Sequence, residues 1–287
     1  MLPLLLSSLS FADSAAPLPD GGTAVYGGLA AYTWRKLRFD TDPEKDSTLD
    51  RDLTFRLDLY ASHGFTDRLS MNVSAPVVWS QVVDDPETNP CPNGPFPCEA
   101  VVTLGSLGVQ ARYAVLTGPV MISPALGLTS SSWNAATRGN YATVGEATTD
   151  VQPGLYIGGH AGSTFSFDWM VAGIYDYRTT FYAAQDGAPA DDVRAFAELR
   201  GGMGIVAVTL GASTYQRFGG VVVASDLGTD DRWAITDYDN LAGTAKVSLA
   251  LPENMGLHLS ATRILWVRNG PPDAIDVSIG VHRWFPG

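Results

Sequence analysis

The sequence predicts an all-β fold, a single transmembrane antiparallel up-and-down β-barrel of about 12 strands with short periplasmic turns and long extracellular loops. Three observations predict it. Apolar and polar residues alternate with a period of two along most of the chain. The connections between these alternating runs are short and long in turn, and aromatic residues gather near the ends of the runs.

The clearest element is a hairpin spanning residues 53–83. Its first run alternates apolar residues such as Phe55 with polar residues such as Arg56, and the second run repeats the pattern from Leu69 onward. The two runs are joined by a turn at residues 64–67 that contains Gly and Asp. Both runs exceed the roughly 5–6 residues usual in soluble sheets and meet the about 9–11 residues that a tilted strand needs to cross a bilayer.

The other strands follow in order, separated by segments rich in Gly, Pro, Asn, Asp, Ser and Thr. We expect them at residues 23–40, 108–116, 120–128, 151–160, 165–177, 193–200, 205–215, 241–251, 257–267 and 275–285. Longer loops should fall at residues 84–102, 130–147, 179–191 and 218–238, with short turns between them. This alternation places short turns on one rim of a barrel and long loops on the other, which soluble sandwiches do not do.

The N-terminus predicts export. Residues 2–6 are apolar, and Ser10-Phe11-Ala12 is a small-x-small cleavage sequence. We therefore expect residues 1–12 to form a signal peptide, with cleavage anywhere within residues 12–22, and residues 23–287 to form the barrel. Together with the strands, export predicts the outer membrane of a Gram-negative bacterium.

Composition excludes several kinds of function. The net charge of −12 argues against nucleic acid, whose phosphates bind clustered Lys and Arg. Cys91 and Cys98 share one Pro-rich loop and cannot complete a four-ligand zinc site, so we expect neither a metal nor a cofactor. In an exported protein a loop-closing disulfide is favoured, and two free thiols in a cytosolic protein are the alternative.

The polar faces of the strands would line the interior of the barrel. The candidate lumen-lining residues are Arg56, Asp58, Arg112, Asp168, Asp176, Arg178, Arg194, Glu198, Arg200 and Lys246. Charges of both signs can line a wet pore or pair into a plug, and a barrel of about 12 strands lies between filled and open ones. Arg263 breaks the alternation, which a bulge or an interfacial position would accommodate.

The long loops are acidic, which favours cations over anions at the mouth of a channel. The acidic residues are Asp84, Asp85, Glu87, Asp226, Asp230, Asp231, Asp237 and Asp239. A solvated surface, or divalent cations that bridge to lipopolysaccharide phosphates, would explain them equally. Their spacing does not match an EF-hand.

The hairpin also carries a resemblance to a known family. Gly64-Phe65-Thr66-Asp67-Arg68-Leu69 through Ala75-Pro76-Val77 resembles the outer-membrane proteins grouped under the MetA pathway of phenol degradation. Gly105-Ser106-Leu107-Gly108 with Arg112-Tyr113, and residues 280–285, are similar to later strands of that family. The resemblance implies an outer-membrane barrel, a passive channel for small apolar compounds, and no catalytic residues. Its partners would be outer-membrane lipid, lipopolysaccharide and the barrel-assembly machinery.

Three functions therefore compete. The favoured one is a porin-like channel or passive transporter for small solutes, apolar or cationic. The second is a lipid-modifying barrel enzyme that uses His258 and Ser260, which are two apart on one strand, although Ala261 and Thr262 replace the Asn and Gly expected after such a pair. The third is a non-conducting structural or adhesion barrel that acts through its loops.

Overall fold

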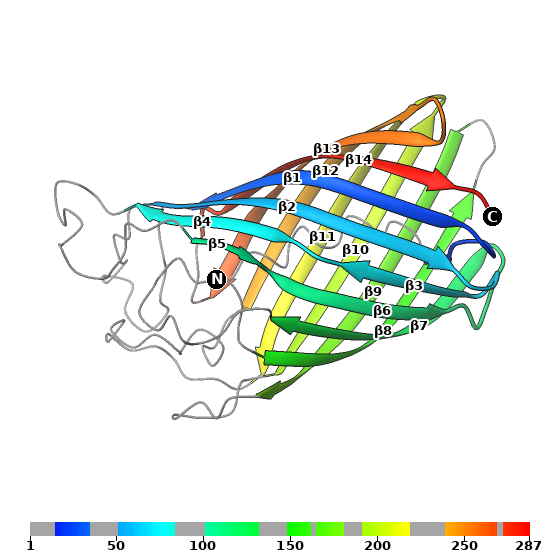
Figure 1. The fold of residues 1–287 in the computed structure, drawn as a ribbon. Coiled ribbons are helices and arrows are strands. Elements are labelled where there is room, and N and C mark those ends of the chain that lie inside the picture. Colours follow the sequence, from blue (N-terminus) through cyan, green and yellow to red (C-terminus); the bar gives the residue numbers. More distant parts are fainter. Residues whose placement is uncertain are drawn as a thin grey trace.

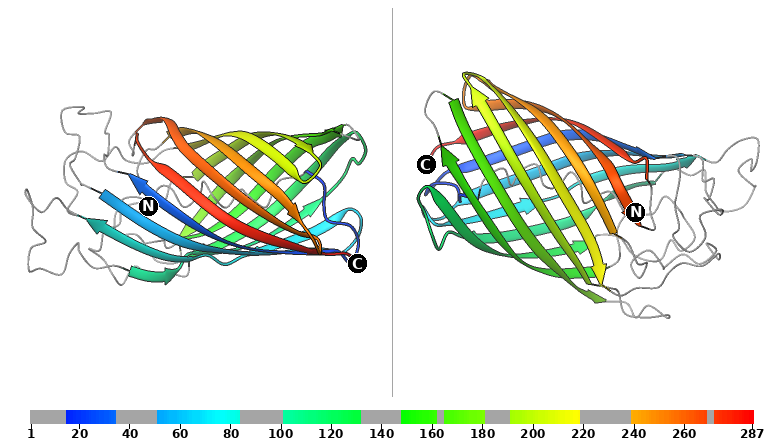
Figure 2. Two further views of the ribbon diagram at one scale, coloured as in Figure 1. Left: turned by 90° about the horizontal axis from the view of Figure 1, so that it is seen from above. Right: turned by 180° about the vertical axis from the view of Figure 1, so that it is seen from behind.

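The computed structural model describes residues 15–34, 51–83, 101–131, 148–161, 165–180, 191–218, 239–268 and 272–287. Within these ranges the regular elements are all β-strands, and they curve into a closed barrel (Figure 1, Figure 2). No helix in this part of the chain is long and apolar enough to span a membrane.

The strands alternate in direction around the barrel. Their bounds are β1 Thr23–Trp34, β2 Arg51–Gly64, β3 Leu69–Ser74, β4 Val77–Val83, β5 Val101–Leu104, β6 Ser106–Tyr113, β7 Val120–Ser131, β8 Thr148–Ala161, β9 Phe165–Thr180, β10 Asp191–Met203, β11 Val206–Phe218, β12 Asp239–Leu251, β13 Met255–Arg268 and β14 Ile275–Phe285. Neighbours pair antiparallel, and β1 pairs with both β14 and β2, which closes the ring. Because β3 with β4, and β5 with β6, are halves of broken strands, the 14 segments make 12 strands, and the predicted barrel is confirmed.

The two broken strands are interrupted at the same level. Pro76, which has no N–H to donate to a ladder, separates β3 from β4, and Gly105 separates β5 from β6. The Gly105 N–H donates to the Pro76 carbonyl at 2.7 Å. A Cβ on Gly105 would lie 2.9 Å from Cγ of Pro76, so glycine permits this close approach.

The pleat sorts side chains between two surfaces. Along β2, Phe55 and Leu57 are exposed on the outside, while Arg56 and Asp58 are buried on the inside. The same alternation runs through β9, where Tyr175 faces outward and the residues on either side of it face inward. The barrel is therefore apolar outside and polar inside.

The connections differ between the two rims. Short connections at residues 65–68, 114–119, 204–205 and 252–254 share a rim with the C-terminus (Figure 1), and β8 ends and β9 begins at this rim. At the other rim the strands are joined through residues 35–50, 84–100, 132–147, 181–190, 219–238 and 269–274. The predicted alternation of connection lengths therefore holds along most of the chain, although residues 269–274 form a connection no longer than residues 114–119.

Aromatic side chains are exposed on the outer surface near both rims. Tyr177 and Trp266 lie near the rim with the longer connections, and Phe165 and Phe285 lie near the other rim, where Trp284 is on the inner face with its register partner Ala24. Such positions are typical of membrane–water interfaces, where the amphipathic rings of Trp and Tyr lie at the level of the lipid headgroups. Of the other aromatics that the sequence placed at strand ends, Trp133, Phe181 and Tyr182 lie outside the described residues.

Two details differ from expectation. Residues 101–102 were expected in a loop, but together with residues 103–104 they form β5, which pairs with β4. A bulge does occur in β13, where the register against β12 shifts between Leu241 and Ala242. It follows Arg263 in β13 and does not turn it inward, so Arg263 stays exposed on the outer surface. Residues 1–12, Cys91 and Cys98 lie outside the described residues.

The outward-facing middle of β1 supplies a test of this surface. Leu29 is 61% exposed there. Leu29→Arg should destabilise the barrel by about 2–4 kcal/mol, because a guanidinium on the lipid face near the midplane must leave water. Urea titration of the heat-modifiable band in lipid vesicles measures the change. Leu29→Val is the control, and equal stability of the two variants would contradict a lipid-facing position.

Candidate pore lining

The predicted lumen residues all lie on the inner face of the sheet. Arg56, Asp58, Arg112, Asp176, Arg178, Arg194 and Lys246 are buried, and Asp168, Glu198 and Arg200 are half-buried. Near the rim with short turns, the carboxylate of Asp168 lies 2.5 Å from Nδ1 of His160, within hydrogen-bond distance. The structure also brings several of these residues together into ion pairs, which the sequence could not specify.

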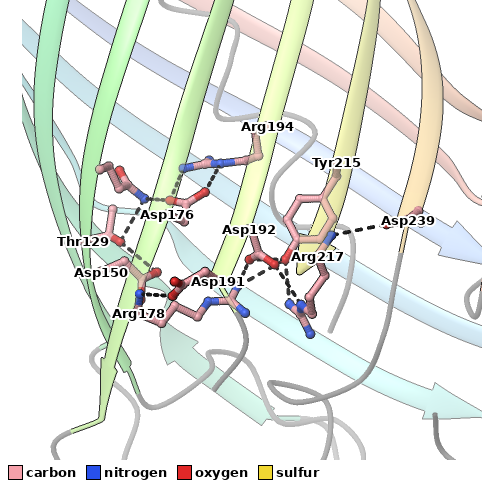
Figure 3. A network of polar contacts seen from close by, with 11 residues as sticks. Thr129, Asp150, Asp176, Arg178, Asp191, Asp192, Arg194, Tyr215, Arg217 and Asp239 are labelled. Atoms are coloured by element: carbon pink, nitrogen blue, oxygen red, sulfur yellow. Dashed lines mark hydrogen bonds and ion pairs between the residues drawn. The ribbon is translucent and has the colours of Figure 1, made fainter. Parts of the chain in front are cut away.

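The first group centres on Asp176 of β9 (Figure 3). Arg194 of β10 donates two hydrogen bonds to its carboxylate, at 2.6 Å from Nε and at 2.7 Å from a terminal guanidinium nitrogen. Gln152 of β8 donates to the same carboxylate at 2.6 Å and to Oγ1 of Thr129 at 3.2 Å. A bidentate Arg–carboxylate pair fixes both side chains, so this group forms a rigid part of the wall.

The second group centres on Asp192 of β10, whose side chain is completely buried (Figure 3). Its carboxylate pairs with Arg178 and accepts a hydrogen bond from the Tyr215 hydroxyl, and Arg217 Nε donates to it at 2.9 Å. Arg217 also donates to the Tyr215 hydroxyl at 2.6 Å. One carboxylate thus holds two guanidinium groups from neighbouring strands.

The groups continue along the rim with the longer connections. Asp191 accepts from the backbone N–H of Arg178 at 3.1 Å. Asp239 at the start of β12 accepts from the backbone N–H of Arg217 at 3.3 Å and pairs with Arg268 of β13 at 2.6 Å. Polar contacts therefore link the neighbouring strands β8 to β13 around the mouth of the barrel.

A separate polar group occupies the opposite wall. Arg56 of β2 pairs with Asp58 at 2.6 Å and lies 3.5 Å from Asp276 of β14. Strands β2 and β14 flank β1, and β9 lies across the ring of 12 strands from β1. Guanidinium and carboxylate groups thus face the lumen from both sides.

Tyr26 of β1 lies flat against this opposite wall. A Cβ added at Gly28 or at Gly280 would meet the Tyr26 ring, 2.1 Å and 2.4 Å from its nearest atoms. The His258 ring stacks on Tyr26, with centroids 4.9 Å apart and planes at 8°. Tyr26 and His258 therefore line the inner wall near the rim with short turns.

The candidate enzyme pair belongs to the same inner face. His258 packs against Tyr26, and Oγ of Ser260 shares a hydrogen bond with Oγ of Ser278 at 2.7 Å. Both residues therefore face the lumen, on the opposite side of the sheet from the apolar outer surface.

Several residues of the wall were not singled out from the sequence. Asp192 and Arg217 fell between the expected strands and loops, and Asp276 lay in the expected last strand without a role. Arg217 is two residues from Tyr215 and faces inward with it. Alternation could have indicated their face. Their partners could not be inferred, because those partners lie on other strands.

Comparison with known proteins extends the description. No family model matches the sequence, and no curated protein is similar to it in sequence. The COG4313 outer membrane channel from Pseudomonas putida F1 is similar in structure, with a TM-score of 0.66 and 15% identity over 95% of this chain and 98% of that one. The fold is that of an outer-membrane β-barrel.

Two further solved structures share this fold. The NanC porin has a TM-score of 0.54 at 10% identity, over 90% of this chain and 98% of that one. The translocator domain of the autotransporter NalP from Neisseria meningitidis has a TM-score of 0.50 at 10% identity, over 92% and 88%. At these identities the likeness concerns the fold alone, and the predicted link to the MetA pathway stays a prediction.

The location follows from the fold and its surface. A closed barrel satisfies its strand hydrogen bonds internally, as the hydrocarbon layer demands, and its outer face exposes apolar side chains around the ring. The protein is therefore placed in the bacterial outer membrane, in contact with its lipid.

The buried charges supply a stability test. Asp192→Ala leaves Arg178 and Arg217 without their shared carboxylate. The free energy of unfolding should fall by about 3–5 kcal/mol, because breaking a buried ion pair leaves an uncompensated charge in the interior. Thermal unfolding followed by heat-modifiable migration measures it.

The matched control is an exposed ion pair at the opposite rim. Glu253 lies 3.2 Å from Arg283, and its side chain is 72% exposed. Glu253→Ala should change stability by no more than about 1 kcal/mol. Equal losses in the two variants would show that Asp192 is not held in a desolvated network.

Proposed function

We propose that the protein is a porin-like channel that passes small solutes passively across the outer membrane. The observation that carries this proposal is an inner wall of paired arginines and aspartates inside a closed barrel whose outer surface is apolar. Polar groups on the lumen side of a transmembrane barrel serve water and solutes rather than lipid. The shared fold with proteins described as a channel and a porin supports the proposal.

The wall favours hydrated solutes over apolar ones. Ion pairs such as Arg194 with Asp176 present charges of both signs side by side, so neither sign dominates the described part of the wall. The sign of selectivity then depends on the acidic residues between the strands and on the net charge of −12, both of which favour cations. We therefore propose small hydrophilic solutes, with cations preferred.

A lipid-modifying activity has less support. Ser260 and His258 lie on the inner wall, whereas acyl chains contact the outer face. We propose that these residues belong to the polar lining. Ser260→Ala should accordingly leave the lipid composition of vesicles unchanged relative to the parent protein.

Conductance in a planar bilayer tests the channel directly. The refolded full chain should give discrete current steps, and a salt gradient should give a reversal potential of cation-selective sign. A bilayer that stays silent after confirmed insertion, both for this chain and for a variant in which residues 15–22 are displaced, would overturn the proposal and favour a barrel that acts through its loops.

The pairing of Asp176 with Arg194 predicts how selectivity can be altered. Asp176→Asn removes the negative partner and leaves the guanidinium on the wall, so the reversal potential should shift toward anions. Glu253→Gln removes one negative charge from an exposed turn and is the matched control. An identical reversal potential for both variants would show that permeating ions do not pass the Asp176 group.

A further inference from the structure

The segment that precedes β1 turns back into the barrel. The N–H of Gly22 donates to the Pro19 carbonyl at 2.9 Å, and Gly21 adopts a left-handed φ of 71°, which reverses the chain at the rim. Figure 1 shows this segment in dark blue at the end of the barrel where the chain terminates. Residues 15–20 therefore do not continue away from the rim.

Gly64 at the end of β2 contacts this turn through its backbone. It accepts from the N–H of Gly21 at 2.9 Å, and its own N–H donates to the Gly22 carbonyl at 2.8 Å. A Cβ at Gly64 would lie 2.1 Å from the carbonyl oxygen of Pro19 and 2.6 Å from that of Leu18. Only glycine leaves room for the segment to cross over the strand end here.

The other end of the segment is buried in the interior. Ala15 is 1% exposed, and its carbonyl accepts a hydrogen bond from Oγ of Ser123 at 2.7 Å. A Cβ at Gly158 would lie 2.8 Å from Cβ of Ala15, so the missing side chain makes the space that Ala15 fills. Ala15 belongs to an apolar cluster with inward residues of β8, β9 and β10: Tyr156, Met170, Ala172, Ile174 and Phe196.

These two anchor points lie on opposite walls. Gly22 is held beside β1 and β2, whereas Ser123, Gly158 and the cluster belong to β7–β10, across the ring of 12 strands. An extended chain covers at most about 3.6 Å per residue, so residues 15–22 can reach about 25 Å. The segment therefore crosses the lumen.

We propose that residues 15–22 form a strap that spans the lumen near the rim with short turns and restricts flow through the channel. The proposal rests on the channel function proposed above. Cleavage at Ala12, the first position of the expected window of residues 12–22, retains the strap in the mature protein. At its far end the strap is held by a hydrogen bond and by packing of one methyl group, so release does not require the strands to separate.

A substitution at Ala15 tests the proposal, because it should displace the strap while the chain keeps its full length. Ala15→Glu would bury a carboxylate among Tyr156, Met170, Ile174 and Phe196, which is unfavourable, so the strap should leave its seat. Single-channel conductance should rise above that of the parent. Ala161→Glu makes the same substitution at an exposed position of β8 on the same rim and should conduct like the parent.

A disulfide cross-link tests the position of the strap in an experiment that does not require the Ala15→Glu variant to fold. In a Cys91→Ser/Cys98→Ser background, Ala15→Cys with Ser123→Cys should form a disulfide in membranes, because the Ser123 side chain lies 2.7 Å from the backbone carbonyl oxygen of Ala15. The oxidised protein should keep the parent conductance. Failure of this disulfide to form would overturn the strap, and so would a mature chain that mass spectrometry shows to begin after Ala15.

The outcomes separate the two proposals. If the parent conducts and Ala15→Glu conducts equally, the strap does not restrict the channel and only the further inference fails. If neither protein conducts after confirmed insertion, the channel function itself fails.

Discussion

Closure of the ring is the constraint on which the rest of the structure depends. In hydrocarbon, an unpaired backbone N–H or carbonyl has no water to bind, so an open sheet edge cannot lie there. Strand β1 meets this demand by pairing with β14 on one side and with β2 on the other. Once the ring is closed, the pleat commits alternate residues to lipid and to lumen, and a slip of one residue in register would exchange the two sets.

The charges of the lumen follow from that commitment. Inward residues cannot reach lipid, but many are shielded from bulk water by their neighbours, and an isolated charge in such a place is costly. The aspartates at the mouth are therefore matched by arginines on adjacent strands, as Asp176 is by Arg194 and Asp192 is by Arg178 and Arg217. These pairs cross between strands, so they also depend on the register that closure fixes.

Alternation and connection length were enough to predict the barrel, its strand number and the inner face of residues such as Arg56 and Arg178. The partners of those residues were not predictable, because Arg217 meets Asp192 only through the register between β10 and β11. Strand β5 was missed because it is short and follows a Pro-rich loop. The Ala15 seat was missed for a different reason. Nothing in a run of Ala, Pro and Leu indicates which wall of a barrel it will contact.

Barrel size explains why a strap can have a place here. About 8 strands enclose an interior that side chains fill, whereas about 16 leave an aqueous channel. At the mouth of this 12-strand ring, Arg178 and Arg217 reach Asp192 on the strand between them, but the wall beneath carries small inward residues such as Ser123 and Gly158. Small residues there leave room for Ala15, which packs against Gly158 and accepts a hydrogen bond from Ser123. The same twelve-strand ring thus carries ion pairs on the wall at its mouth, and at its opposite end we propose that its own chain spans the lumen.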